Sequence, residues 1–194
     1  MKITLHLVAL SCLALSALTL AGAQSLPRSF PRIERESSQP RELISEGLGV
    51  GQVYVWHSTA EDVEAAYGKD FERIEHGAHT VEMRYATRDL SFFYCQSDSR
   101  KRIIDIECRA PFRGFTARGV TLGKSTVRDV FKAYGEAKPS TSSNNTYWTF
   151  SYPGVEFSIP YKDKPAASLL GEKITVIDVT TPRSGSDCLA TNLK

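Results

Sequence analysis

The sequence has few cysteines, almost no net charge and none of the common catalytic or metal-binding motifs. Its 194 residues include 4 Cys, and 24 Lys and Arg against 22 Asp and Glu give a net charge of +2. Nucleic-acid-binding proteins usually carry a clustered basic excess, so we do not expect a nucleic-acid partner. The sequence contains no Cys-x-x-Cys pair, zinc-type Cys/His spacing or Gly-x-Ser-x-Gly elbow. We therefore predict neither an enzyme nor a cofactor.

The one long apolar run of the sequence lies at its N-terminus. Lys2 precedes this run, which ends in small residues at Ala23. That order is typical of a cleavable signal peptide, so we predict that residues 1–23 are removed and that the chain is exported, to a periplasm or out of the cell. Scattered prolines predict a flexible leader over 24–47, and 181–194 reads as a similar tail.

An exported chain meets oxidising conditions, so its cysteines are candidates for a disulfide. Cys12 would leave with the signal peptide, and Cys95, Cys108 and Cys188 would remain. Three cysteines allow three alternative pairings, each with one bridge and one free thiol. We expect a pairing that includes Cys188, because it would hold the tail.

The most informative feature of the sequence is an internal similarity. Residues 58–68 and 125–135 are identical at seven of eleven positions, at an offset of 67. In both segments the apolar residues recur at the spacing of one helix face, and a glycine follows the last of them. We expect Ser58 to cap the first helix in a capping box, and Thr126 with Asp129 to do so in the second.

Alternating apolar residues, as at Val81, Met83 and Tyr85, predict three strands after each helix. The expected fold class is α+β, with two tandem repeats over 48–112 and 113–180. Each repeat would consist of a helix and an antiparallel sheet, with the helices on one sheet face and the other face open to solvent.

The segment Gly119–Ser125 and the helix end at Tyr134 and Gly135 resemble the SmpA/OmlA outer-membrane lipoprotein module. The tandem arrangement resembles the β-lactamase inhibitory protein fold. The resemblance covers roughly residues 48–180. It implies an envelope or secreted protein that binds other proteins across an open sheet face, with no catalysis and no cofactor.

Five aromatic or basic residues are the candidates for partner binding. Arg84, Phe93 and Tyr147 fall on the outward register of the expected strands, and Tyr54 and Trp56 precede the first helix. Arg and large aromatic side chains commonly anchor protein interfaces. The alternative is that they pack against the leader or the other repeat.

We therefore expect a non-catalytic protein-binding module. The alternatives are an inhibitor of a secreted enzyme and a small-ligand or metal-binding periplasmic protein.

Three further patterns have simpler interpretations. Gly119–Thr126 resembles the end of a phosphate-binding loop, but Arg118 stands where such a loop needs its first glycine, so we predict a helix start. His76 and His79 could bind zinc or copper, but they read as solvated loop residues, so we predict no metal. The basic residues from Arg100 to Arg118 could contact a membrane surface, but they are typical of solvated hairpins.

Overall fold

Apolar and polar residues alternate over short segments of the sequence, and most of the regular secondary structure is accordingly β-strand. The computed structural model describes residues 40–141, 146–161, 166–181 and 188, all within the unit formed by residues 38–194. The predicted signal peptide, most of the predicted leader and most of the predicted tail lie outside the described residues.

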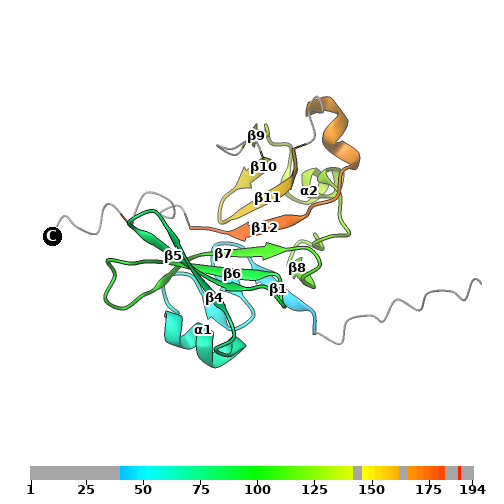
Figure 1. Ribbon diagram of the computed structural model, residues 1–194. Coiled ribbons are helices and arrows are strands. Elements are labelled where there is room, and N and C mark those ends of the chain that lie inside the picture. Colours follow the sequence, from blue (N-terminus) through cyan, green and yellow to red (C-terminus); the bar gives the residue numbers. More distant parts are fainter. Residues whose placement is uncertain (1–39, 142–145, 162–165, 182–187, 189–194) are drawn as a thin grey trace, which may run out of the picture. The chain divides into compact units, whose positions relative to one another are not determined.

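The described residues form two β-sheets and two α-helices, arranged as in Figure 1. The larger sheet has eight strands in the order β4-β5-β6-β7-β12-β11-β10-β9, and all its neighbours are antiparallel. Its strands are β4 (Glu72–His76), β5 (Thr80–Tyr85), β6 (Leu90–Cys95), β7 (Ile103–Arg109), β9 (Ser140–Thr141), β10 (Tyr147–Tyr152), β11 (Val155–Pro160) and β12 (Val176–Val179).

The smaller sheet has the order β3-β2-β1-β8, and its β1 and β8 are parallel. Its strands are β1 (Glu42–Ser45), β2 (Gly49–Val50), β3 (Val53–Tyr54) and β8 (Gly114–Thr116). The helices are α1 (Ala60–Tyr67), α2 (Val127–Tyr134) and the short 3-10 helix η1 (Ala166–Gly171).

The predicted fold class, α+β with two tandem helix-plus-sheet repeats, is wrong. The protein is mostly β, and β7 pairs with β12, so the strands of both halves form one sheet. A strand edge with unpaired N–H and C=O groups tends to pair with another strand. Here the edges of β7 and β12 supply hydrogen-bond partners to each other. The sequence also gives no signal for the four-stranded sheet, because strands of two to four residues are too short to show alternation. Its strand β1 lies within the expected leader.

Both helices begin at a threonine with a complete capping box. The hydroxyl of Thr59 accepts from the N–H of Asp62, whose carboxylate accepts from the N–H of Thr59. Thr126 and Asp129 make the same pair in α2, as predicted. The predicted cap at Ser58 is wrong, because the Ser58 hydroxyl instead accepts a hydrogen bond from an upstream backbone N–H.

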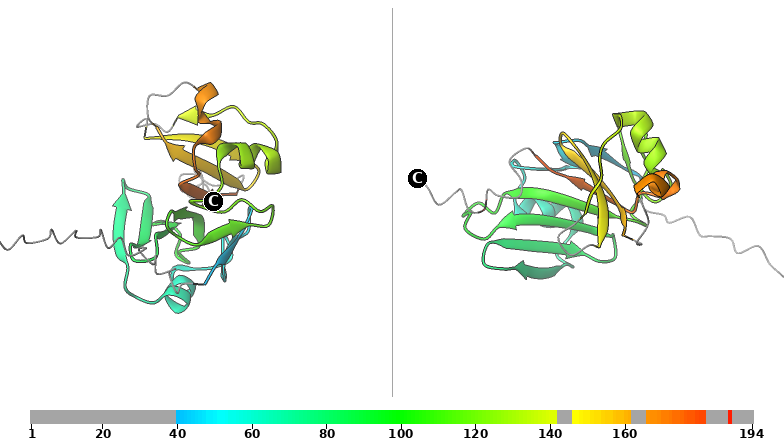
Figure 2. Two further views of the ribbon diagram at one scale, coloured as in Figure 1. Left: turned by 90° about the vertical axis from the view of Figure 1, so that its right-hand side faces the viewer. Right: turned by 90° about the horizontal axis from the view of Figure 1, so that it is seen from above.

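One face of the eight-stranded sheet packs against both helices and the four-stranded sheet (Figures 1 and 2). From α1, the Tyr67 ring lies 5.1 Å from Phe92 between centroids. From α2, the Tyr134 ring lies 4.9 Å from Phe157. The largest fully buried side chains of this core are Tyr85, Phe92, Phe150, Phe157, Ile44, Met83, Leu90, Ile103, Ile106, Ile159, Ile174 and Ile177.

Hydrogen bonds connect the C-terminal ends of both helices to the region of β1. The Tyr67 hydroxyl donates to Glu42 Oε2 at 2.7 Å. The Tyr134 hydroxyl donates to Glu46, one residue after β1. The segment that begins the described structure therefore joins α1 to α2.

We predict that Gly154→Ala destabilises the fold by about 2 kcal/mol or more, because it adds a steric clash to an unfavourable backbone angle. Gly154 has φ +82°, and an added Cβ would lie 2.5 Å from the backbone N of Gly47. Gly77, at φ +63° with open space around it, is the matched control. Gly77→Ala should cost about 1 kcal/mol. Urea unfolding measures both, and equal losses would contradict the close-approach argument.

Candidate functional site on the polar face

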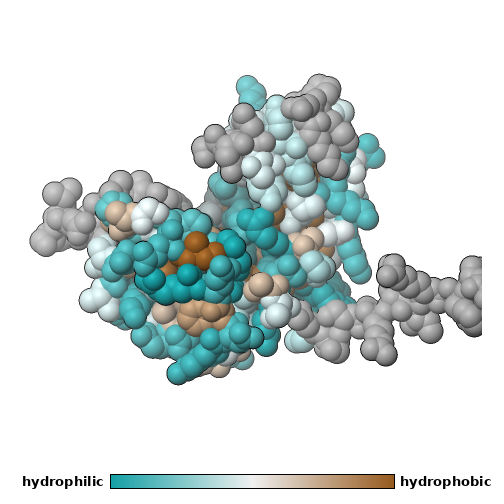
Figure 3. Space-filling model, in the orientation of Figure 1, coloured by the Kyte–Doolittle hydropathy of each residue, from teal (hydrophilic) through white to brown (hydrophobic). Residues whose placement is uncertain are grey.

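The two faces of the eight-stranded sheet differ in chemistry. Side chains alternate between faces along each strand, so the face away from the core carries a separate set of residues. We call it the polar face, and on the described strands it includes Glu72, Ile74, His76, Thr80, Glu82, Arg84, Ser91, Phe93, Asp105, Glu107, Arg109, Tyr147, Thr149, Ser151, Glu156, Ser158, Val176 and Asp178. In the view of Figure 3, the surface over β4, β5 and β6 is mostly hydrophilic around a small hydrophobic spot.

A row of charged and polar side chains crosses the polar face from strand to strand. Arg84 lies opposite Ser91, and Ser91 lies opposite Glu107. Glu107 lies opposite Asp178, which lies opposite Glu156. Directly opposite residues have Cβ atoms about 5 Å apart, so three carboxyl groups stand side by side on β7, β12 and β11.

At one end of this face a buried carboxylate is fully paired. Glu82 is only 2% exposed, and it accepts hydrogen bonds from Arg84 Nε at 2.8 Å and Ser91 Oγ at 2.7 Å. His76 Nε2 lies 2.6 Å from its other oxygen. Burial raises the pKa of Glu82, but the hydrogen bonds from Arg84, Ser91 and His76 outweigh burial, so the pKa lies below its ordinary value. Glu82 therefore holds Arg84 in a fixed position.

Arg109 lies at the end of β7 and reaches across the polar face towards β10. Its guanidinium donates to Glu107 at 2.5 and 2.8 Å and to the Tyr147 hydroxyl at 2.7 Å. Arg109 is on β7 and Tyr147 on β10, with β12 and β11 between them. The contact thus passes over the two intervening strands, whose residues Val176 and Ser158 are buried. Arg109 and Tyr147 form a partly exposed aromatic and cationic pair, with the guanidinium carbon 5.7 Å from the ring centroid.

Asp105 and Asp178 lie close together on the same face. Burial, followed by the nearby Glu107 and Glu156, raises the pKa of Asp105 to about 7. Burial and then the neighbouring Asp105 raise the pKa of Asp178 well above its ordinary value. Asp105 Oδ1 is buried without a hydrogen-bond partner. These carboxyl groups therefore hold protons at a pH where an exposed aspartate is ionised.

A disulfide closes the end of the face near Phe93. Cys95 of β6 is bonded to Cys188, and Cys108 is the free thiol among the described cysteines. The expected pairing that includes Cys188 is confirmed. Cys95, Cys188 and Ile104 form a small apolar cluster apart from the main core, against which Phe93 and Trp56 pack.

The disulfide is characteristic of an oxidising environment and so of an exported chain. Among the described residues, no helix combines the length and the apolar character needed to cross a membrane.

The structure brings together some of the predicted binding residues and separates others. Arg84, Phe93 and Tyr147 lie on the polar face, as their register predicts. Trp56 and Phe93 both pack against the disulfide cluster, and the indole N–H of Trp56 donates to the Thr181 hydroxyl at 2.7 Å. Tyr54 lies on the four-stranded sheet and is 46% exposed.

Sequence reasoning left three groups out of this site. The sequence groups Arg109 with the basic residues typical of solvated hairpins, and its motifs do not single out Asp105 or Glu107. The available signal was their alternation with the apolar Ile104, Ile106 and Cys108 on β7.

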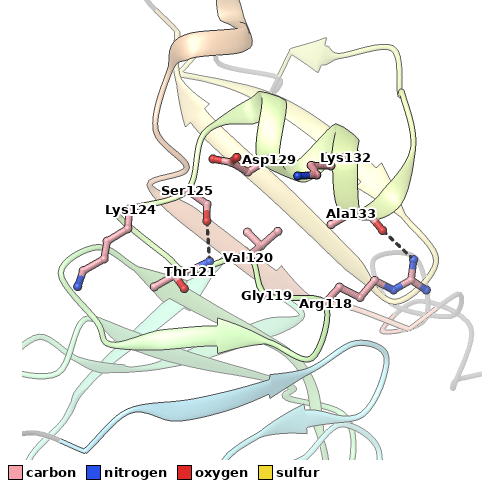
Figure 4. Close-up of a pocket in the computed structure, with 9 residues that line it drawn as sticks. All are labelled: Arg118, Gly119, Val120, Thr121, Lys124, Ser125, Asp129, Lys132 and Ala133. Carbon is pink, nitrogen blue, oxygen red and sulfur yellow. Dashed lines mark hydrogen bonds between the residues drawn. The ribbon is translucent and has the colours of Figure 1, made fainter.

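The phosphate-loop resemblance does not make a phosphate site. The hollow of about 550 Å³ at this loop is lined by Arg118, Lys124, Lys132 and Asp129 among others (Figure 4). A phosphate cradle needs free backbone N–H groups, but those of residues 119–127 are already bonded. They serve the turn and the helix start, as predicted from the sequence.

The other candidates for chemistry are placed as follows. Burial raises the pKa of the Cys108 thiol well above its ordinary value, which disfavours a nucleophilic thiolate. His76 is on β4 beside Glu82 rather than in a loop. The described part of the chain contains no cluster of three or more His, Cys, Asp or Glu suited to a metal ion.

No protein-family model and no curated protein matches the sequence. A crystal structure of a DUF4309 family protein, YjgB from Bacillus subtilis, is similar to 70% of this chain and 88% of that chain, with 14% identity and a TM-score of 0.44. We draw no function from a likeness at this level.

We predict that Asp105→Asn stabilises the protein at pH 8 and has little effect at pH 4. An acid whose pKa is higher in the folded than in the unfolded chain favours folding at low pH, and that contribution is lost as pH rises through about 7. A gain of about 1 kcal/mol would raise Tm by roughly 2–4 °C.

Asp98→Asn is the control of opposite sign. Hydrogen bonds from Arg102 outweigh the partial burial of Asp98 and hold its pKa below the ordinary value. This variant should lose stability near neutral pH, and the loss should shrink as pH falls towards 3. Thermal melts of both variants across this range give the comparison, and a lower Tm for Asp105→Asn at pH 8 would contradict the assignment.

We also predict that the double variant Cys95→Ser/Cys188→Ser loses about 2–4 kcal/mol of unfolding free energy, because the bridge joins residues 93 positions apart. Cys108→Ala, which leaves the bridge intact, should cost less. Guanidinium unfolding without reductant measures both, and an unchanged double variant would show that the bridge adds no stability.

Proposed function

We propose that this chain is an exported, non-catalytic protein that binds a protein partner through the polar face. The observation that carries this proposal is the Arg109–Tyr147 pair, joined by a 2.7 Å hydrogen bond that crosses two strands of a continuous sheet, at the strand ends. Arg and Tyr are among the side chains that contribute most to binding energy, and fixed side chains lose little entropy on association.

The charges around this pair would orient the partner. Arg84 and Arg109 are exposed, and the carboxyl groups of Glu107 and Glu156 lie on the same face. A patterned surface of both signs favours a partner with the complementary pattern and disfavours others. The resemblance of residues 119–135 to the SmpA/OmlA module supports the same proposal. The location would be a periplasm or the extracellular space, and the disulfide supports export.

The test is capture of a partner from cell-envelope extract and culture medium by the purified chain, followed by affinity measurement with that partner. Arg109→Ala/Tyr147→Ala should weaken binding at least tenfold, because it removes this pair. Lys132→Ala, an exposed change on α2 away from the polar face, should leave affinity unchanged. Thermal melts establish that each variant is folded.

Two results would overturn the proposal. One is equal affinity of the partner for the wild type and Arg109→Ala/Tyr147→Ala. The other is a loss of affinity in Lys132→Ala alone. If the captured partner is an enzyme, its activity with and without the chain decides whether binding inhibits it.

A further inference from the structure

The eight-stranded sheet has one long open edge, and it is β4. Among the strands that the structure describes, β4 pairs only with β5, so alternate backbone N–H and C=O groups of Glu72–His76 face away from the sheet. The opposite edge, β9, has two residues, and the edge strands of the smaller sheet, β3 and β8, have two and three. Of the described strands, β4 therefore offers the longest template for another strand.

The charge sequence of β4 is complementary to itself when read in the opposite direction. Its residues are Glu72, Arg73, Ile74, Glu75 and His76, and all except the half-buried Ile74 are exposed. Arg73 and Glu75 share one face, where Arg73 Nη1 lies 2.5 Å from Glu75 Oε1. A second antiparallel copy centred on Ile74 places each Arg73 opposite the Glu75 of the other copy.

We infer that β4 pairs antiparallel with β4 of a second copy of this chain, about a twofold axis at Ile74, to form a symmetric dimer. The two apolar Ile74 side chains meet at the axis. Two Arg73–Glu75 pairs form on one face, and Glu72 lies opposite His76 of the other copy on the other face. The outward N–H and C=O groups of both strands become hydrogen-bonded.

The same residues disfavour the alternative pairings. A parallel pair in register would place Arg73 beside Arg73 and Glu75 beside Glu75, and like charges directly opposite one another destabilise a sheet. A shift of one residue would move Ile74 onto the face of Arg73 and Glu75 of the other copy. Charges on an edge strand commonly prevent edge pairing, and this order of signs permits one antiparallel register.

The dimer would also extend the surface proposed for partner binding. Glu72, Ile74 and His76 lie on the polar face, in register with Arg84, Glu82 and Thr80 of β5. Pairing through β4 therefore makes the polar faces of two copies continuous. The dimer and the partner site use different residues, so each can fail without the other.

Charge reversal at β4 tests the pairing. Arg73→Glu alone or Glu75→Arg alone should be monomeric, because each places like charges opposite one another. An equimolar mixture of the two should form a heterodimer, and Arg73→Glu/Glu75→Arg should again form a homodimer. Sedimentation velocity of the purified chain at about 100 µM measures these states, since a small interface gives a weak association. Lys132→Glu on α2 is the control and should remain dimeric.

A cysteine at the axis tests the register. Ile74→Cys should form an intermolecular disulfide under mild oxidation, because opposite Cα atoms lie roughly 4.5–5.5 Å apart, within disulfide reach. Arg73→Cys should not, because in this register its two copies stand about 8 Å apart. A monomeric wild type would overturn the inference, as would a dimer that Arg73→Glu leaves intact or equal cross-linking of the two cysteine variants.

Discussion

The pairing of β7 with β12 is the constraint on which the rest of the structure depends. Four residue pairs, from Val176 opposite Arg109 to Val179 opposite Ile106, join the strands of both halves into one sheet. Once this pairing exists, alternation assigns every side chain on eight strands to one of two faces. Apolar side chains occupy the buried face, and most of the charged side chains of these strands lie on the other face.

Packing on the core side of the sheet also sets the backbone positions of the polar face. The aromatic side chains of α1 and α2 pack against β5, β6, β10 and β11, and the β1 segment holds both helices through Glu42 and Glu46. Because the backbone positions are set by this packing, side chains on the opposite face stand at fixed spacings. Arg109 can therefore reach Tyr147 across two strands, and the carboxylate of Glu82 can form hydrogen bonds with three side chains.

A binding function is consistent with how these groups are used. The charged groups on the polar face mostly bond to one another, as in the pairs of Arg84 with Glu82 and Arg109 with Glu107. Such pairs fix geometry and give a surface a recognisable charge pattern, while contributing little to the stability of the free protein where they are exposed. The raised pKa values of Asp105 and Asp178 show that part of this face is ordered at a cost in stability near neutral pH.

The sequence by itself determined the local elements. The capping box of the second helix, the glycine ends of both helices, the inward stripe of β5, the outward register of Arg84 and Phe93, and a disulfide that includes Cys188 follow from spacing and residue type. These features depend on neighbours within a few residues or on the redox compartment, so periodicity reveals them.

Only the tertiary structure decided which strands pair at long range and which side chains meet. The union of the halves through β7 and β12, the four-stranded sheet built from Glu42–Ser45 and other short strands, and the Arg109–Tyr147 contact have no local signal. The physical reason is that a strand edge offers the same N–H and C=O groups whatever its side chains, so the choice of its partner is made by the packing of the whole core.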